Sequence, residues 1–166
     1  QNMLDFTPLD GKDAVAVNEM SHLATDIVRE HFDPLIGKAQ NDYMLARFQT
    51  PQAIAEQTAH GSRYYFVREN GQDAGFVAFY PRDGKMYLSK FYLKKEMRGK
   101  GYAHEMLSFV LDETKKAGLP AVFLNVNRYN DACRAYEALG FTVARYEVND
   151  IGNGFVMDDA VYEYTL

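Results

Sequence analysis

The spacing of hydrophobic residues along the first part of the chain predicts one strand followed by helices. Residues 3–7 alternate apolar and polar side chains, which indicates a short strand. Residues 13–31 carry apolar side chains near helical spacing, and Phe32-Asp33-Pro34 predicts the end of that helix because the position before proline avoids the α region. A second helix is expected over residues 41–48. A third begins after Thr50-Pro51, with the threonine as N-cap and the proline as the first helical residue.

The periodicity then changes to that of strands. Residues 62–69, 74–80 and 85–94 are rich in Tyr, Phe and Val. They are separated by Asn70-Gly71-Gln72-Asp73 and by Pro81-Arg82-Asp83-Gly84, both of which are turn sequences. The pattern therefore predicts an antiparallel meander of three strands.

The last part of the chain mixes both periods. In chain order the pattern predicts an amphipathic helix over residues 101–117 closed by Gly118, a buried strand at 120–126, a helix at 131–139 closed by Gly140, and strands at 141–148 and 156–164 around a polar loop at 149–154. A strand–helix–strand crossover inside a mostly antiparallel sheet gives a single α/β (α+β) domain over residues 1–166, with a mixed sheet flanked by helices.

Composition narrows the class of protein. The chain has 166 residues, 47% of them apolar, and a formal net charge of −5, the balance of an ordinary globular domain. The acidic balance argues against a nucleic-acid binder, whose affinity would depend on neutralising phosphates. One cysteine, Cys133, cannot form an internal disulfide, and no apolar run reaches the length of a membrane span. The first five residues lack the pattern of a signal peptide, so we expect a cytoplasmic protein.

One segment of this acidic chain is locally basic. Where the strand at 85–94 leads into the helix at 101–117, the sequence reads Lys94-Lys95-Glu96-Met97-Arg98-Gly99-Lys100-Gly101-Tyr102-Ala103. Glycines let the backbone approach a ligand closely, and a helix N-terminus presents unpaired N–H groups. Together with the basic side chains they predict an anion site, with a pyrophosphate as the expected ligand.

Two known phosphate-binding motifs are excluded for this segment, and one structural alternative stays open. It lacks the Gly-Lys-Ser/Thr of a Walker A loop, and His104 stands where the dinucleotide-binding pattern has its third glycine. A glycine pair alone is also compatible with a tight strand-to-helix connection carrying solvated lysines.

Two motifs bear a resemblance to a known family. Arg98-Gly99-Lys100-Gly101-Tyr102-Ala103 after a strand resembles the acetyl-coenzyme A (acetyl-CoA) pyrophosphate loop of the GNAT superfamily of N-acetyltransferases. Downstream, Asn127-Arg128-Tyr129-Asn130 and Ala135-Tyr136-Glu137-Ala138-Leu139-Gly140-Phe141 resemble a second segment of the family, although the stretch from Asn130 to Tyr136 is a residue shorter than in common members. The helical first half is similar to bacterial spermidine/spermine N-acetyltransferases around His31-Phe32-Asp33, Tyr43-Met44 and Phe48-Gln49-Thr50.

The resemblance implies roles for particular residues. Main-chain groups of Phe91, Tyr92 and Leu93 would hold the pantetheine and thioester, and would act as an oxyanion hole. The residues implied to bind the cofactor's phosphates and neighbouring groups are Arg98, Gly99, Lys100, Gly101, Tyr102, Ala103 and Asn130. The phenol of Tyr136 would protonate the leaving thiolate. The alternative for Tyr136 is a core side chain that packs helix against sheet.

The base that takes the acceptor's proton is unassigned from the sequence. Many family members have a glutamate on the strand before the loop, but Leu88-Ser89-Lys90 holds no carboxylate. The candidates are water relayed by Ser89, or a side chain from the helical half such as Glu30, His31 or Asp33. We interpret Cys133 as a packing residue rather than a nucleophile.

The resemblance implies an acetyl-CoA-dependent N-acetyltransferase that works by direct attack in a ternary complex, without a metal. The expected acceptor is a small primary amine, with a polyamine as the first candidate and a peptide or protein amine as the alternative. A rival outside the enzyme class is an acyl-CoA-binding sensor without turnover, because the strand lacks its carboxylate. No nucleic-acid or membrane partner is expected. The sequence is compatible with a homodimer but has no feature that fixes one.

Overall fold

A computed structural model describes residues 4–166. The strands are β1 (Leu4–Pro8), β2 (Arg63–Glu69), β3 (Gln72–Arg82), β4 (Lys85–Leu93), β5 (Ala121–Asn127), β6 (Thr142–Gly152) and β7 (Phe155–Thr165). The helices are α1 (Ala14–Ile36), α2 (Lys38–Phe48), α3 (Pro51–Ala59), α4 (Tyr102–Lys116) and α5 (Ala132–Ala138), with a 3-10 turn at Lys95–Met97. The predicted strand residue Met3 lies outside the described part of the chain.

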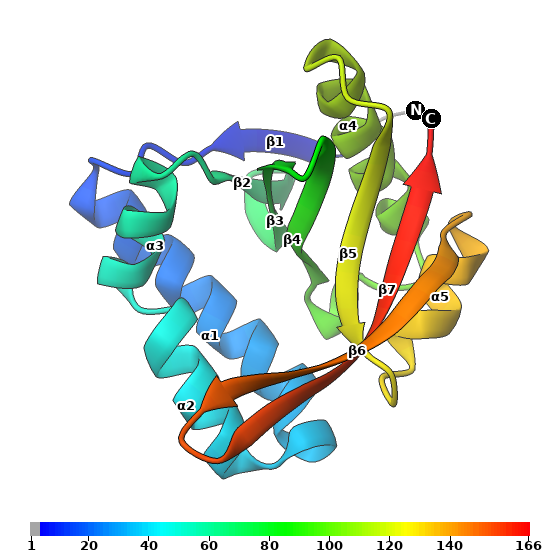
Figure 1. Cartoon of the computed structure of the whole chain (residues 1–166). Coiled ribbons are helices and arrows are strands. Elements are labelled where there is room, and N and C mark those ends of the chain that lie inside the picture. Colours follow the sequence, from blue (N-terminus) through cyan, green and yellow to red (C-terminus); the bar gives the residue numbers. More distant parts are fainter. Residues whose placement is uncertain (1–3) are drawn as a thin grey trace. The chain divides into compact units, whose positions relative to one another are not determined.

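The strands form one mixed seven-stranded sheet in the order β1-β2-β3-β4-β5-β7-β6 (Figure 1). Neighbours β1/β2, β2/β3, β5/β7 and β6/β7 are antiparallel, whereas β4 and β5 are parallel and are joined through α4. The predicted α/β fold with a crossover inside a mostly antiparallel sheet is confirmed.

The chain divides into two compact units. The first comprises residues 1–80 and 90–106, and the second comprises residues 81–89 and 107–166. The boundaries pass through β4 and α4, so each unit holds part of both elements. We describe the two units separately.

The core of the first unit lies between its helices and one face of β2 and β3. Met20 and Ile27 of α1, Ile54 of α3 and Phe76 of β3 are all buried in one apolar cluster. In Figure 1 α1 runs beside both α2 and α3. Thr50 caps α3 as predicted, since its hydroxyl accepts a hydrogen bond from the Ala53 amide at 3.1 Å.

The prediction that α1 ends before Pro34 is wrong. The helix continues through Pro34 to Ile36 and ends at Gly37, whose φ of 87° is left-handed. A proline in the last turn removes only one backbone hydrogen bond, and the Gly37 amide still donates to the Asp33 carbonyl at 3.1 Å.

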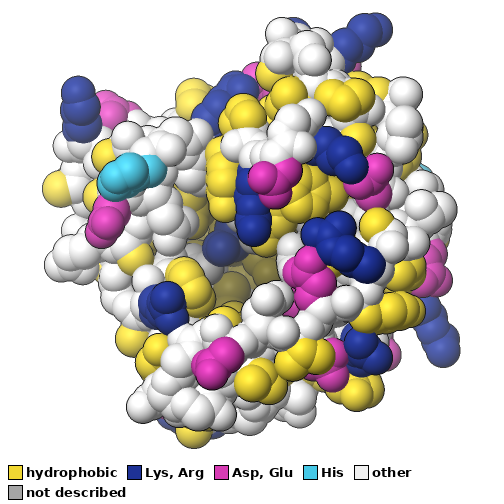
Figure 2. Space-filling view, viewed as in Figure 1, with side chains coloured by type: hydrophobic (Ala, Val, Ile, Leu, Met, Phe, Trp, Pro, Cys, Tyr) yellow, Lys and Arg dark blue, Asp and Glu magenta, His cyan; other side chains and the backbone are white. Residues whose placement is uncertain are grey.

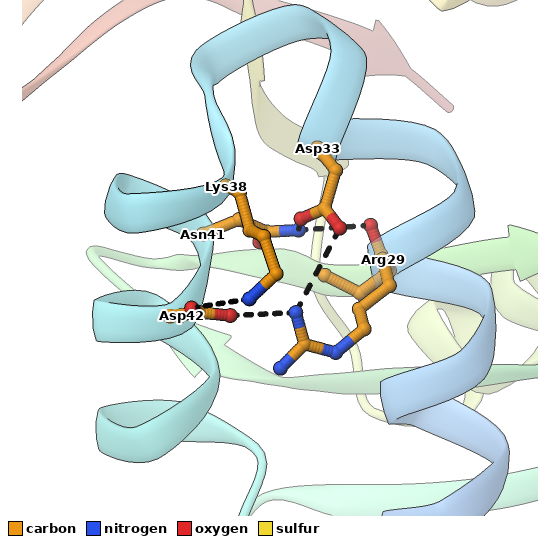
Figure 3. Close-up of polar contacts among 6 residues, drawn as sticks. Arg29, Asp33, Lys38, Asn41 and Asp42 are labelled. Carbon is orange, nitrogen blue, oxygen red and sulfur yellow. Dashed lines mark hydrogen bonds and ion pairs between the residues drawn. The ribbon is translucent and has the colours of Figure 1, made fainter.

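Side chains hold the end of α1 against the start of α2, which begins at Lys38 rather than at residue 41. As Figure 3 shows, Asp33 accepts a hydrogen bond from Asn41 at 2.7 Å and pairs with Arg29 at 3.7 Å. Asp42 in turn pairs with Arg29 at 2.6 Å and with Lys38 at 2.9 Å. These contacts compensate for the irregular backbone around the proline.

Three hairpins turn on an Asx-Gly pair in which both residues have positive φ. Asn70-Gly71 joins β2 to β3 and Asp83-Gly84 joins β3 to β4, as the turn sequences predict. The third pair, Asn153-Gly154, corrects a prediction: most of the expected loop at 149–154 belongs to β6, and only these two residues make the turn. Polar residues in a long exposed hairpin have no burial pattern that would distinguish strand from loop.

The second unit is built around β5, β7 and β6, with α5 packed against β7. The ring of Tyr136 on α5 meets Phe141 at 5.8 Å and Tyr162 at 6.2 Å between centroids, and Phe141 contacts Tyr164 at 5.5 Å. Aromatic pairs of this kind pack the helix onto the sheet. In the described residues, no helix is long and apolar enough to cross a membrane.

Candidate functional site

The carboxyl end of β4 is held unusually close to β3. A side chain at Gly75 would come within 2.0 Å of the Tyr92 carbonyl oxygen, so only glycine permits this approach. The β2–β3 register shifts between Val67 and Arg68, which are paired with residues on either side of Ala74. The Ala74 carbonyl accepts a hydrogen bond from the Lys94 amide at 2.8 Å. A β3 irregularity thus fixes the backbone of the predicted thioester-binding residues Phe91, Tyr92 and Leu93.

Aromatic side chains secure the same strand end from the side of α1. The Tyr92 ring lies 5.4 Å from Phe76, 6.0 Å from Phe32 and 6.0 Å from His31, measured between centroids. Tyr92 therefore serves as a packing residue through its side chain. The functional prediction for Phe91, Tyr92 and Leu93 concerns only their main-chain groups.

The glycine loop follows directly. After the 3-10 turn at Lys95–Met97, Gly99 and Gly101 have φ values of 77° and 80°, the left-handed region that glycine adopts without strain. A Cβ built on either glycine meets nothing within 4 Å, so the space above the loop is open. Helix α4 starts at Tyr102, where its first N–H groups lack helical partners. The loop and the helix N-terminus together provide a cradle for an anion.

Basic side chains surround this cradle. Arg98, Lys100 and Lys95 are exposed, and Lys94 is half-buried. The Lys100 ammonium lies 5.9 Å from the centroid of the Tyr102 ring, while Tyr102 itself is buried and anchors the first turn of α4. In the view of Figure 2, acidic and basic side chains are interspersed over the surface. The loop is therefore a local concentration of positive charge in an acidic chain.

Arg98 contacts one of the proposed bases. Its guanidinium donates a hydrogen bond to Nε2 of His31, and that nitrogen lies 3.5 Å from the Leu93 carbonyl. Burial, followed by the positive charge of Arg98, lowers the pKa of His31 below its ordinary value. His31 thus joins α1 to the loop through the hydrogen bond from Arg98.

The other base candidates from the helical half have different surroundings. Asp33 is engaged by Asn41 and Arg29 in the junction of α1 with α2, which gives it a structural role. Glu30 is half-buried on α1. Ser89 lies in the second unit.

Lys90 stands just before the predicted thioester-binding strand. Its side chain is half-buried, and the described residues give it no hydrogen bond or ion pair. Burial lowers the pKa of Lys90 to about 8. This position therefore carries an amine whose charged form is disfavoured by burial, and no carboxylate.

Two of the predicted site residues belong to the second unit. Tyr136 is 8% exposed on α5, and Asn130 precedes that helix, where its Oδ1 accepts a hydrogen bond from the Ala132 amide at 2.8 Å. Burial raises the pKa of Cys133, which agrees with a packing role. The remaining predicted cofactor-binding residues, Phe91 to Leu93 and Arg98 to Ala103, all lie in the first unit, where the structure brings them together with His31.

A buried carboxylate escaped the sequence analysis. Asp159 on β7 is 2% exposed, and Asn125 on β5 donates a hydrogen bond to its Oδ2 at 3.3 Å. In the sequence, Asn125 and Asp159 are polar residues within otherwise apolar strand patterns. That pattern does not indicate a buried carboxylate, because it is common in strands with one solvated face.

Comparison with known proteins identifies the family. The model of the acetyltransferase (GNAT) family matches residues 25–141, well over half of the chain. No curated protein matches the sequence.

Solved structures share the fold at low identity. The PaiA N-acetyltransferase of Thermoplasma acidophilum, in complex with coenzyme A, is 16% identical and has a TM-score of 0.77, with 98% of this chain and 99% of that chain covered. A GNAT acetyltransferase of Elizabethkingia anophelis with bound acetyl-CoA is 14% identical, with a TM-score of 0.66 and both chains fully covered. The ribosomal-protein-S18-alanine N-acetyltransferase of Escherichia coli is 19% identical, with a TM-score of 0.66 and coverage of 98% and 94%.

The family match includes the glycine loop, the start of α4 and Tyr136. The predictions of a GNAT-like fold, of an acetyltransferase and of acetyl-CoA as cosubstrate are thereby confirmed at the level of the family. The chain belongs to the GNAT family of acetyltransferases.

Proposed function

We propose that this protein transfers the acetyl group of acetyl-CoA to a primary amine by direct attack in a ternary complex. The observation that carries the proposal is the basic glycine loop at the N-terminus of α4, which directly follows a strand end fixed by Gly75. Membership of the GNAT family gives this loop its expected ligand, the cosubstrate pyrophosphate.

The residues present fit that ligand. The open space above Gly99 and Gly101 admits phosphate oxygens close to the backbone, and the first N–H groups of α4 are available as donors. Arg98 and Lys100 would add charge-assisted hydrogen bonds, which are stronger than neutral ones. When bound, acetyl-CoA supplies an activated acetyl group as a thioester.

The remaining roles concern the acyl transfer itself. Main-chain N–H groups of Phe91 to Leu93 would bind the thioester oxygen and stabilise the negative charge that develops there when the amine attacks. The phenol of Tyr136, protonated at neutral pH, would donate a proton to the departing sulfur. Tyr136 is largely buried on α5.

For the acceptor, a polyamine is the first candidate. The net charge of −5 favours a cationic substrate, and a polyamine agrees with the expectation drawn from the sequence of the helical half. A peptide or protein amine is the second candidate, because a structural neighbour from Escherichia coli acts on an alanine of a ribosomal protein.

Release of free thiol from acetyl-CoA tests the proposal. The purified protein is incubated with acetyl-CoA and, in turn, with polyamines, amino acids and short peptides. We expect amine-dependent thiol release that saturates with both substrates. Tight binding of acetyl-CoA without release of free thiol for any amine would contradict the enzyme and support the acyl-CoA-binding sensor.

A further inference from the structure

Strand β6 forms one edge of the sheet. It is the last strand in the sheet order, and within the described residues it pairs only with β7 (Figure 1). In the described chain, residues 145–150 make no backbone hydrogen bond outside that ladder. Alternate N–H and C=O groups of an edge strand point away from its neighbour, so β6 presents a row of backbone groups that can pair with a further strand.

This edge is long and exposed. Most of the 11 residues of β6 are exposed, among them Tyr146 at 58% and Val148 at 66%. Edge strands are commonly protected from pairing by lysine or proline, and β6 contains neither. The ladder with β7 is irregular just before Arg145 and just after Asp150, and is regular between them. Residues 145–150 therefore form a regular strand edge that is accessible from outside.

Tyr146 is held in place on one face of this edge. The Arg128 guanidinium lies 4.4 Å from the centroid of the Tyr146 ring, and Arg128 also pairs with Asp158 at 2.7 Å. A large side chain that is already ordered loses little conformational freedom when a partner binds. Tyrosine and arginine are also enriched in protein interfaces, so this face has the composition of a contact surface.

The opposite face of the same segment carries two opposite charges. Arg145 donates a hydrogen bond to Glu147 at 2.6 Å, and this bond lowers the pKa of Glu147 below its ordinary value. Residues two apart in a strand lie on the same face, so the two charges stand side by side while Tyr146 between them points the other way.

The spacing of these charges is self-complementary. In an antiparallel pair of identical strands related by a two-fold axis, residues that face each other lie on the same side of the sheet, so the axis passes between two copies of one residue. Centred on Tyr146, such a pairing puts Arg145 of each copy opposite Glu147 of the other. Every other centre within residues 145–150 leaves these charges unmatched or sets like charges opposite each other.

We propose that β6 pairs with β6 of a second copy of this chain, antiparallel and centred on Tyr146, to form a symmetric dimer. Arg145 and Glu147 of the two copies then form a ring of four alternating charges on one face, and the two Tyr146 rings meet on the other. Every residue of this interface belongs to the second unit. The inference is independent of the proposed enzymatic activity.

Charge reversal tests the register of the pairing. In sedimentation velocity of the purified full chain, we expect a reversible dimer whose fraction rises with concentration. In Arg145→Glu two acidic side chains face each other, and the Kd of the dimer should rise by about tenfold or more. The double variant Arg145→Glu/Glu147→Arg restores opposite charges across the interface and should return the Kd close to the wild-type value.

Arg134→Glu is the matched control. It makes the same change of charge at an exposed residue of α5 in the same unit, and it should leave the Kd of the dimer unchanged. Circular dichroism of each variant shows whether its monomer is folded. The recovery of the dimer in the double variant separates a lost contact from a lost fold.

Cysteine cross-linking locates the two-fold axis. In a Cys133→Ser background, Tyr146→Cys should form a disulfide between copies under mild oxidation, because facing residues of an antiparallel pair have Cβ atoms about 4.5–5.5 Å apart. Val148→Cys lies on the same exposed face, but its counterpart is about 13 Å away along the strand in this register, so it should not cross-link.

Three results would overturn the proposal. One is a wild-type chain that sediments as a monomer at every concentration. Another is a dimer whose Kd does not change in Arg145→Glu, which would place the interface elsewhere. The third is a disulfide that forms in Val148→Cys and not in Tyr146→Cys, which would contradict the pairing centred on Tyr146.

Discussion

Arg98 of the glycine loop donates a hydrogen bond to Nε2 of His31 on α1. The contact links the predicted phosphate site to the helical part of the first unit. Burial, and after it the charge of Arg98, lowers the pKa of His31 beside the Leu93 carbonyl. A bound pyrophosphate would compete with His31 for the guanidinium, because anionic oxygens are stronger acceptors than an imidazole nitrogen.

Replacement of Arg98 therefore has two measurable consequences. In Arg98→Met we expect the pKa of His31 to rise, because a cation that disfavours the imidazolium is gone. We also expect the Kd for coenzyme A to increase by about tenfold or more, the effect of losing a charge-assisted hydrogen bond. NMR titration of the imidazole and calorimetry measure the two effects.

Lys116→Met is the matched control for Arg98→Met. It removes one positive charge from the exposed end of α4, far along the helix from the loop, and should change neither quantity. An unchanged His31 pKa in Arg98→Met would contradict the hydrogen bond to His31.

The role of the glycine loop in cosubstrate binding can be tested by comparing Gly101 with Gly118, a control glycine that has similar backbone geometry. Gly101 and Gly118 have φ values of 80° and 73°, and a Cβ on either meets nothing within 4 Å. Alanine at either position should cost roughly 1–2 kcal/mol of stability from the left-handed conformation. Only Gly101→Ala should also raise the KM for acetyl-CoA, because its methyl group occupies the open cradle. Equal KM values for acetyl-CoA in Gly101→Ala and Gly118→Ala would contradict the prediction that the loop binds the cosubstrate.

Tyr136 and Tyr162 offer a comparison between neighbouring phenols. Tyr136→Phe should keep the packing against Phe141 and lower kcat by about 10²-fold through loss of the general acid. Tyr162→Phe removes a hydroxyl that donates to Glu137 at 2.6 Å, so it should cost about 1 kcal/mol of stability and leave kcat unchanged. A fully active Tyr136→Phe enzyme would make Tyr136 a core residue only.

Asp159 should reduce the stability of the folded protein at neutral pH. Its pKa rises from 3.8 to about 6 on folding, so the native state binds the proton more tightly and stability falls as pH rises between these values. The penalty is complete above the folded pKa and amounts to about 3 kcal/mol. Urea unfolding of Asp159→Asn should show this gain above pH 6 and no gain below the unfolded pKa. A variant less stable than the wild type at neutral pH would contradict a desolvated carboxylate.

The sequence was most informative where local chemistry alone determines structure. The Asn70-Gly71 and Asp83-Gly84 turns and the Thr50 cap require only a few adjacent residues, and each was predicted. The segment from Arg98 to Ala103 pointed to the family through its resemblance to the acetyl-CoA loop, and its role as a phosphate site stays a prediction. The family match then confirmed the enzyme class.

The predictions failed where distant contacts decide. Helix α1 passes Pro34, and there Asn41 of α2 donates a hydrogen bond to Asp33, a contact between two helices that no local rule includes. The strand β6 extends to Gly152 because β7 pairs with it, although its residues read as a polar loop. The burial of Asp159 next to Asn125 became visible only in the structure, because the two residues are 34 positions apart in sequence.

The most direct test of the account is identification of the reaction product. Mass spectrometry of an amine acceptor incubated with the protein and acetyl-CoA should show an N-acetyl amine, formed with one free coenzyme A for each acetyl group transferred. Coenzyme A release without an acetylated amine, or an acetyl group found on oxygen or sulfur, would contradict N-acetyl transfer.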